Sequence, residues 1–102
     1  MSKFTFTPGP WNAEPDGFDA YRIKSEDFGG VAYLHDPLAS ALNRNKELTA
    51  NARLIAAAPE LAGLLADIQR NYAATSSGAA FATAYTNRFA ARASALLARI
   101  NA

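Results

Sequence analysis

Two patterns of apolar and polar positions divide the chain near residue 45. In the first part, apolar and polar side chains alternate over short stretches separated by proline and glycine, as in strands with one buried face. Strands are predicted near Trp11–Ala13, Tyr21–Lys24 and Val31–Leu34. The loop from Glu26 to Gly30 has a length that suits a β-hairpin with glycine at a positive φ angle. The first part therefore predicts a small antiparallel sheet.

From Lys46 onward the chain is rich in residues that favour helix and poor in helix breakers. Apolar residues recur three and four positions apart and predict one apolar stripe along the helices: Leu48, Ala52, Ile55, Leu61, Leu64, Leu65, Ile68 and Tyr72. Pro59 interrupts this stripe and predicts either a kink in one helix or the start of a second, because proline fits only the first turn of a helix. A break within Tyr72–Gly78 precedes a last helix that runs to about Ile100.

The fold class predicted from these elements is α+β, in a single domain of residues 1–102. Residues 1–40 supply a small antiparallel sheet of two to three short strands, and residues 45–102 supply two to three α-helices packed on it. A chain of this length has room for one core. Half of its residues are hydrophobic, but many of these are alanines, which bury little area each. Formation of a homodimer would increase the buried area.

Composition excludes several kinds of site. The chain contains no cysteine, which excludes disulfides, thiolate metal sites and cysteine nucleophiles. It lacks both a signal-peptide pattern and a run of about 20 apolar residues, so we expect a soluble, cytoplasmic protein without membrane contact. The net charge of +1 is too small to attract nucleic acid strongly, although acidic residues prevail in 1–40 and basic residues in 41–102.

Candidate catalytic residues are few. His35 and Asp36 are the one place in the sequence where a histidine adjoins a carboxylate, as general acid–base chemistry requires. Asp36 also precedes Pro37, an arrangement that favours a plain turn. The motifs of serine nucleophiles, EF-hands and P-loops are absent from the sequence. We therefore expect no enzymatic activity, no cofactor and no metal ion.

The predicted last helix has the most suggestive surface. At 100° per residue, an apolar stripe and a basic edge lie side by side on it: Phe81, Tyr85, Phe89, Leu96 and Ile100 form the stripe, and Arg88, Arg92 and Arg99 form the edge. In one interpretation the stripe packs into the core or a dimer seam, and the arginine stems cover its rim. In the other, Tyr85 and the three arginines bind a partner, either an acidic protein surface or a phosphate backbone.

Two segments carry a family resemblance, Thr7–Trp11 (TPGPW) and Asn51–Leu61 (NARLIAAAPEL). In this order they resemble a group of short proteins encoded by tailed phages and prophages, with a TPGPW opening and an ANA-x-LIAAAPELL helix. The resemblance extends through about Leu65, and it implies an accessory role in a phage without catalytic residues. We expect a non-enzymatic protein that binds a host protein complex, and inhibition of host defence, as by an anti-CRISPR protein, is one form of this role. The alternative is a small nucleic-acid-binding module that uses the C-terminal arginines.

Overall fold

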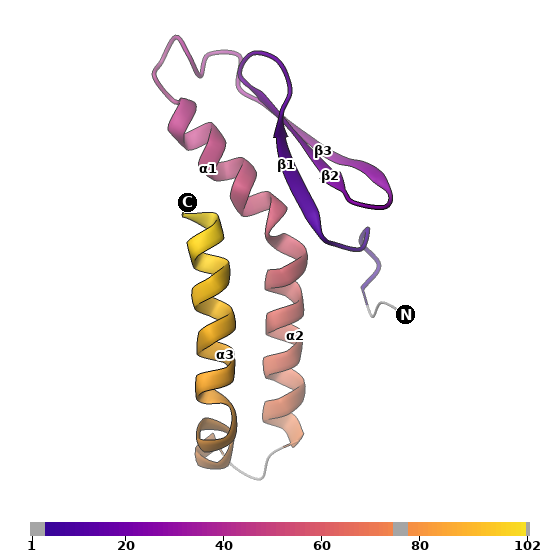
Figure 1. Cartoon of the computed structure of the whole chain (residues 1–102), viewed down its shortest axis with the longest axis vertical. Coiled ribbons are helices and arrows are strands. Elements are labelled where there is room, and N and C mark those ends of the chain that lie inside the picture. The colour runs from indigo at the N-terminus through magenta and orange to yellow at the C-terminus, as the bar shows by residue number, and fades with distance from the viewer. Residues whose placement is uncertain (1–3, 75–77, 102) are drawn as a thin grey trace.

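The computed structural model describes residues 4–74 and 78–101, and within 73–86 it describes no side chains. Six elements follow in chain order: β1 (Trp11–Pro15), β2 (Ala20–Ser25), β3 (Gly29–His35), α1 (Asn45–Ala56), α2 (Ala58–Ala74) and α3 (Gly78–Ile100). This arrangement confirms the predicted α+β class and the three predicted strands. Helix α1 lies against the sheet, whereas α2 and α3 form an antiparallel hairpin that extends away from it (Figure 1).

The sheet is antiparallel with the strand order β1-β2-β3. The central strand β2 places Ile23 opposite Ala13 on one side and Ala32 on the other. Ile23 is fully buried, and the hydroxyl of Tyr21 lies 2.9 Å from the hydroxyl of Thr49 on α1. The face of β2 that carries the odd-numbered side chains therefore packs against α1, as expected for a strand with alternating polarity.

The helical chain restarts at Pro59 instead of bending there. Helix α1 ends at Ala56 and α2 begins at Ala58, so Pro59 occupies the first turn of the second helix. The missing amide of proline costs little at that position, since the first amides of a helix have no partner within the helix. The buried Ala57 connects the two helices, and its carbonyl accepts a hydrogen bond of 3.0 Å from the amide of Leu61.

The two segments that carry the family resemblance meet in the structure. Trp11 is half-buried, and its indole Nε1 donates a hydrogen bond of 3.0 Å to the carbonyl of Thr7, which closes the TPGPW segment into a turn. Gly9 of this turn lies directly against Pro59, so closely that a Cβ atom at Gly9 would lie 2.7 Å from the Cβ of Pro59. The N-terminal segment is thus fixed at the point where the chain passes from α1 to α2.

The core of the hairpin is small. Leu64 of α2 packs with Phe89 and Leu96 of α3, and each of the three is less than 9% exposed; partly buried neighbours are Leu61, Ile68 and Ala93. Leu65 and Tyr72, which the predicted stripe places among the inward positions, are instead 68% and 55% exposed. That part of the prediction is wrong because α2 faces a single helix, and the side chains that one helix can cover span a narrow stripe.

The molecule is elongated. Its extents are 54 × 30 × 15 Å and its radius of gyration is 16.9 Å, whereas a compact domain of about 100 residues has a radius of about 13 Å. The hairpin accounts for this shape, because it projects beyond the sheet as a layer of two helices (Figure 1). Within the described ranges, no helix combines the length and the apolar character needed to cross a membrane.

Candidate protein-interaction site

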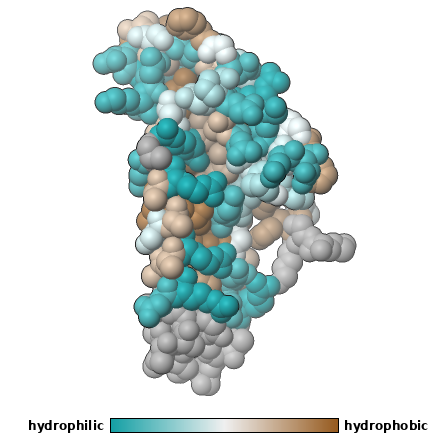
Figure 2. All heavy atoms as spheres, in the orientation of Figure 1, coloured by the Kyte–Doolittle hydropathy of each residue, from teal (hydrophilic) through white to brown (hydrophobic). Residues whose placement is uncertain are grey.

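The charged residues of α2 and α3 all lie on one side of the hairpin. A helical wheel at 100° per residue places all of them on the same side of the plane that contains the two helix axes. We call this surface the charged face, and its residues are Glu60, Asp67, Arg70, Arg88, Arg92 and Arg99. Hydrophilic side chains form a band across the two helices on the side that Figure 2 shows. The charged face is therefore a continuous surface built from both helices.

Ion pairs between the helices organise this face. Arg92 Nη1 lies 2.8 Å from Asp67 Oδ2, and Arg99 Nη1 lies 3.4 Å from Glu60 Oε1. Arg70 contacts the other carboxylate oxygen of Asp67 from within α2. Hydrogen bonding from Arg92, together with the charge of Arg70, lowers the pKa of Asp67 below its ordinary value. The Asp67 carboxylate is thus charged at neutral pH and holds two arginines in place.

The structure brings three of the four predicted partner-binding residues onto this face. Arg92 and Arg99 are ion-paired with α2, and Arg88 is exposed beside them. Tyr85 belongs to α3, but its side chain lies outside the described residues. Phe89 and Leu96 occupy the core of the hairpin, as one of the two interpretations of the stripe predicts.

The acidic partners on α2 were not among the predicted site residues, although a signal for them exists. Glu60 and Asp67 are seven residues apart, and so are Arg92 and Arg99. Seven residues are close to two helical turns, so each pair lies on one side of its helix with the same axial separation. In an antiparallel hairpin the first acid then meets the last arginine, which is the pairing observed.

Two shallow hollows lie along the charged face on either side of the Arg92–Asp67 ion pair. One, of about 250 Å³, is lined by Glu60, Gly63, Arg92, Ala95, Leu96 and Arg99. The other, of about 260 Å³, is lined by Asp67, Arg70, Asn71, Arg88, Phe89 and Arg92. The first hollow therefore joins apolar surface around Leu96 to charged groups, whereas the second is almost wholly polar. Both are smaller than the pockets of roughly 300–1,000 Å³ that hold small-molecule ligands, and they match single side chains of a partner better.

One buried polar atom of Glu60, a residue that lines the first hollow, lacks a hydrogen-bond partner among the described residues. Glu60 Oε2 is buried and accepts no hydrogen bond from the described residues, while Glu60 Oε1 lies 3.4 Å from Arg99. A buried carboxylate oxygen without a donor is energetically costly.

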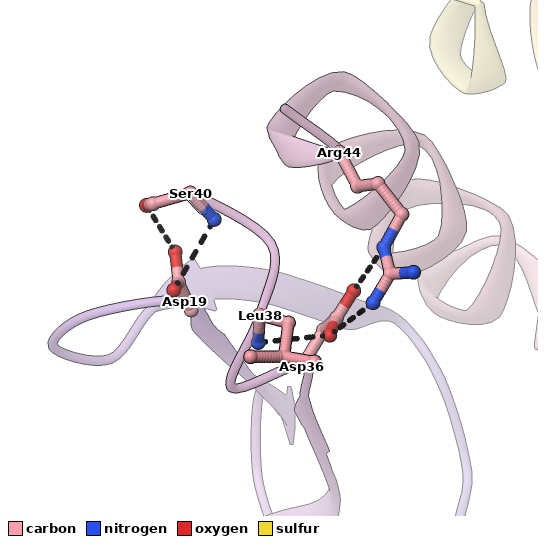
Figure 3. A network of polar contacts seen from close by, with 5 residues as sticks. All are labelled: Asp19, Asp36, Leu38, Ser40 and Arg44. Atoms are coloured by element: carbon pink, nitrogen blue, oxygen red, sulfur yellow. Dashed lines mark hydrogen bonds and ion pairs between the residues drawn. The ribbon is translucent and has the colours of Figure 1, made fainter. Parts of the chain in front are cut away.

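The carboxylate of Asp36, next to His35, makes hydrogen bonds within its own loop and to the residue before α1. The carboxylate of Asp36 accepts hydrogen bonds of 2.8 and 3.0 Å from Arg44 and one of 3.2 Å from the amide of Leu38 (Figure 3). The bond from Arg44 is the main cause that lowers the pKa of Asp36. His35 is exposed, with its ring centroid 6.0 Å from that of Tyr33. Asp36 therefore anchors the loop that leads into α1.

A second carboxylate fixes the same loop to the turn between β1 and β2. Asp19, at a φ angle of 55°, accepts hydrogen bonds of 2.6 Å from the hydroxyl and 3.3 Å from the amide of Ser40 (Figure 3). Across residues 4–74 and 78–101, no three His, Asp or Glu side chains gather closely enough to hold a metal ion.

The fold and the charged face define a small α+β protein whose helical hairpin presents a surface of paired charges. A family model described as Salmonella phage P22 protein Y8K6 matches residues 1–100. The chain therefore belongs to this phage protein family, and the match confirms the phage affiliation that the two sequence segments indicated. Comparisons with curated proteins and with solved structures give no match.

Proposed function

We propose that this phage protein is a non-enzymatic accessory protein that binds a host protein complex in the host cytoplasm through its charged face. The observation that carries the proposal is the first hollow, because it joins apolar surface around Leu96 to the ion-paired Arg92 and Arg99. Such a combination is typical of interaction hot spots, in which arginine is enriched. Inhibition of a host defence complex, as by an anti-CRISPR protein, is the form of this role that we favour.

The balance of charge favours a protein partner over nucleic acid. Four arginines on the charged face stand against two carboxylates, and Arg92 and Arg99 already pair with those carboxylates. Affinity for a phosphate backbone depends on the number of cations that replace condensed counterions. A surplus of two positive charges supplies a weak electrostatic attraction of this kind, whereas prepositioned arginines suit hydrogen bonding to a protein surface.

The test is an affinity purification of the tagged protein from host lysate, with and without nuclease, followed by mass spectrometry. The test variant is Arg88→Glu/Arg92→Glu. The matched control is Arg22→Glu/Lys24→Glu, which makes the same change in net charge on the sheet, where Arg22 and Lys24 also pair with carboxylates.

We expect a nuclease-resistant host complex that the wild type and the sheet variant retain and the charged-face variant loses. Loss of the complex on nuclease treatment would instead support the nucleic-acid-binding alternative. Equal retention by both variants would show that the charged face is not the binding surface.

A further inference from the structure

The side of the hairpin opposite the charged face carries no charged side chain among the described residues. Its exposed positions come from both helices, and we call them the uncharged face: Leu65, Gln69 and Tyr72 of α2, and Ala90, Ser94 and Leu97 of α3. Leu65 is 68% exposed, and Tyr72 and Leu97 are each 55% exposed. Three large, exposed apolar side chains on one side of the hairpin indicate a surface that is covered in the functional state.

We propose that a second copy of this chain packs its uncharged face against this one, so that the two hairpins form a four-helix bundle. In a two-fold dimer the same surface patch occurs on both sides of the interface. The uncharged face meets this condition without repulsion. The charged face does not, because its surplus of arginines would meet the same surplus on the second copy.

The layering of the molecule also supports a second copy of the chain as the partner on the uncharged face. Domains usually consist of at least two packed layers around a core, but the hairpin is a single layer of two helices with Leu64, Phe89 and Leu96 as its buried core. A second hairpin would supply the missing layer, and four antiparallel helices with apolar inward faces form a stable bundle.

The available area is sufficient for a dimer. Helix α2 has 17 residues and is therefore about 26 Å long, and two adjacent helices span about 20 Å across. The face thus offers about 500 Å² per copy, or about 1,000 Å² in total, which meets the minimum of about 1,000 Å² for a biological interface and lies below the range of about 1,200–2,000 Å² for stable ones, so we expect a weak dimer. Small side chains at Ala90 and Ser94 allow the facing helices to approach closely.

The experiment is sedimentation-velocity centrifugation of the purified full chain, with no host partner present. The test variant is Leu65→Glu/Leu97→Glu. The matched control is Leu38→Glu/Leu42→Glu, which makes the same substitution at two leucines that are 52% and 53% exposed in the loop before α1. We expect the wild type and the loop variant to sediment at twice the 10.9 kDa chain mass and the hairpin variant at the single mass.

A wild-type protein that stays at the single mass at about 100 μM would overturn the proposal, as would a hairpin variant that stays at the double mass. Far-UV circular dichroism checks that the hairpin variant keeps its helices. If it does not, cysteine cross-linking decides, since the natural chain has no cysteine. Leu65→Cys or Leu97→Cys should give a covalent dimer with a short bismaleimide and Leu38→Cys should not, and the reverse result refutes the interface. Because this assay contains no host protein, its outcome is independent of the proposed host-binding function.

Discussion

Gly9 is the position where one added methyl group has the clearest consequence for the fold. Its backbone lies against Pro59, and a Cβ atom there would be 2.7 Å from the Cβ and 3.2 Å from the Cγ of Pro59. Pro59 cannot move aside, because its ring is closed on the backbone of α2. Overpacking of this kind costs about 1–3 kcal/mol. Replacement of glycine by alanine without a clash gains about 0.4–1 kcal/mol from the unfolded chain. The midpoints of the two ranges give a net destabilisation of about 1.3 kcal/mol for Gly9→Ala.

Gly30→Ala is the matched control, because a Cβ atom at Gly30 would meet nothing within 4 Å and the φ angle there is not in the left-handed region. Thermal unfolding followed by circular dichroism measures both variants. We expect Gly9→Ala to lower Tm by roughly 5–10 °C, since 1 kcal/mol corresponds to about 4–8 °C in a domain of this size. Gly30→Ala should leave Tm unchanged within about 4 °C or raise it.

A double-mutant cycle with Pro59→Gly, which removes the clashing Cβ atom, identifies the cause of the loss. The cost of Gly9→Ala should fall by at least about 1 kcal/mol when residue 59 is glycine. A Gly9→Ala variant as stable as the wild type, or a cost that is the same in both backgrounds, would refute the close packing of the two family segments.

Two further predictions concern the hairpin core and the loop before α1. Phe89→Ala should lower the free energy of unfolding, measured by urea titration, by about 3–5 kcal/mol. Leu54→Ala, at a position 50% exposed on α1, should change it by less than about 0.5 kcal/mol. Similar losses for the two variants would show that Phe89 is not a core residue. Arg44 lowers the pKa of Asp36 in the folded state. The ionised carboxylate therefore stabilises the fold at pH values above its unfolded pKa of about 3.9. This stabilisation is lost as the pH falls through the lower pKa of the folded state. Asp36→Asn should therefore be less stable than the wild type at pH 7, and the difference should close as the pH falls below about 4. A difference independent of pH would contradict the ion pair.

The strands could be predicted because the pattern that defines each one lies within a few neighbouring residues of the sequence. Alternation around Ile23 marks the buried side of β2. The predicted loop runs through Gly30 and the predicted strand begins at Val31, whereas β3 begins at Gly29. The sequence alone does not decide between a kink and a new helix at Pro59, because that choice depends on the residues packed around it. The packing of Gly9 against Pro59 and the buried turn at Ala57 belong to those surroundings.

The inward side of α2 was harder to predict, because apolar side chains surround more of that helix than one neighbour can cover. Leu64 and Leu65 are adjacent in sequence and differ by 100° around the helix, so only the position of α3 decides which of them is buried. The sequence shows the apolar residues but not the number of helices that cover them. This is why Leu65 and Tyr72 were placed in the stripe and are exposed in the structure.

For a related reason, the sequence predicts the arginines of the charged face but not the carboxylates that pair with them. The arginines of α3 are visible as one edge of a helix, but their relation to Glu60 and Asp67 depends on the antiparallel pairing of α2 with α3. Once the pairing is known, the equal spacing of acids and arginines explains the register of the hairpin. These ion pairs also change how the arginines would bind a partner. A guanidinium held by a carboxylate acts as a positioned hydrogen-bond donor more than as a mobile charge.

The two faces of the hairpin make the proposed dimer and the proposed function compatible. If the uncharged faces pack together, the charged faces of the two copies point outward on opposite sides of the bundle, because each lies opposite the interface on its own hairpin. No residue of the charged face is then buried in the dimer interface. A host complex with repeated subunits could contact both charged faces, and the second contact would form at a high effective concentration, so modest affinity at each shallow hollow would suffice for stable binding.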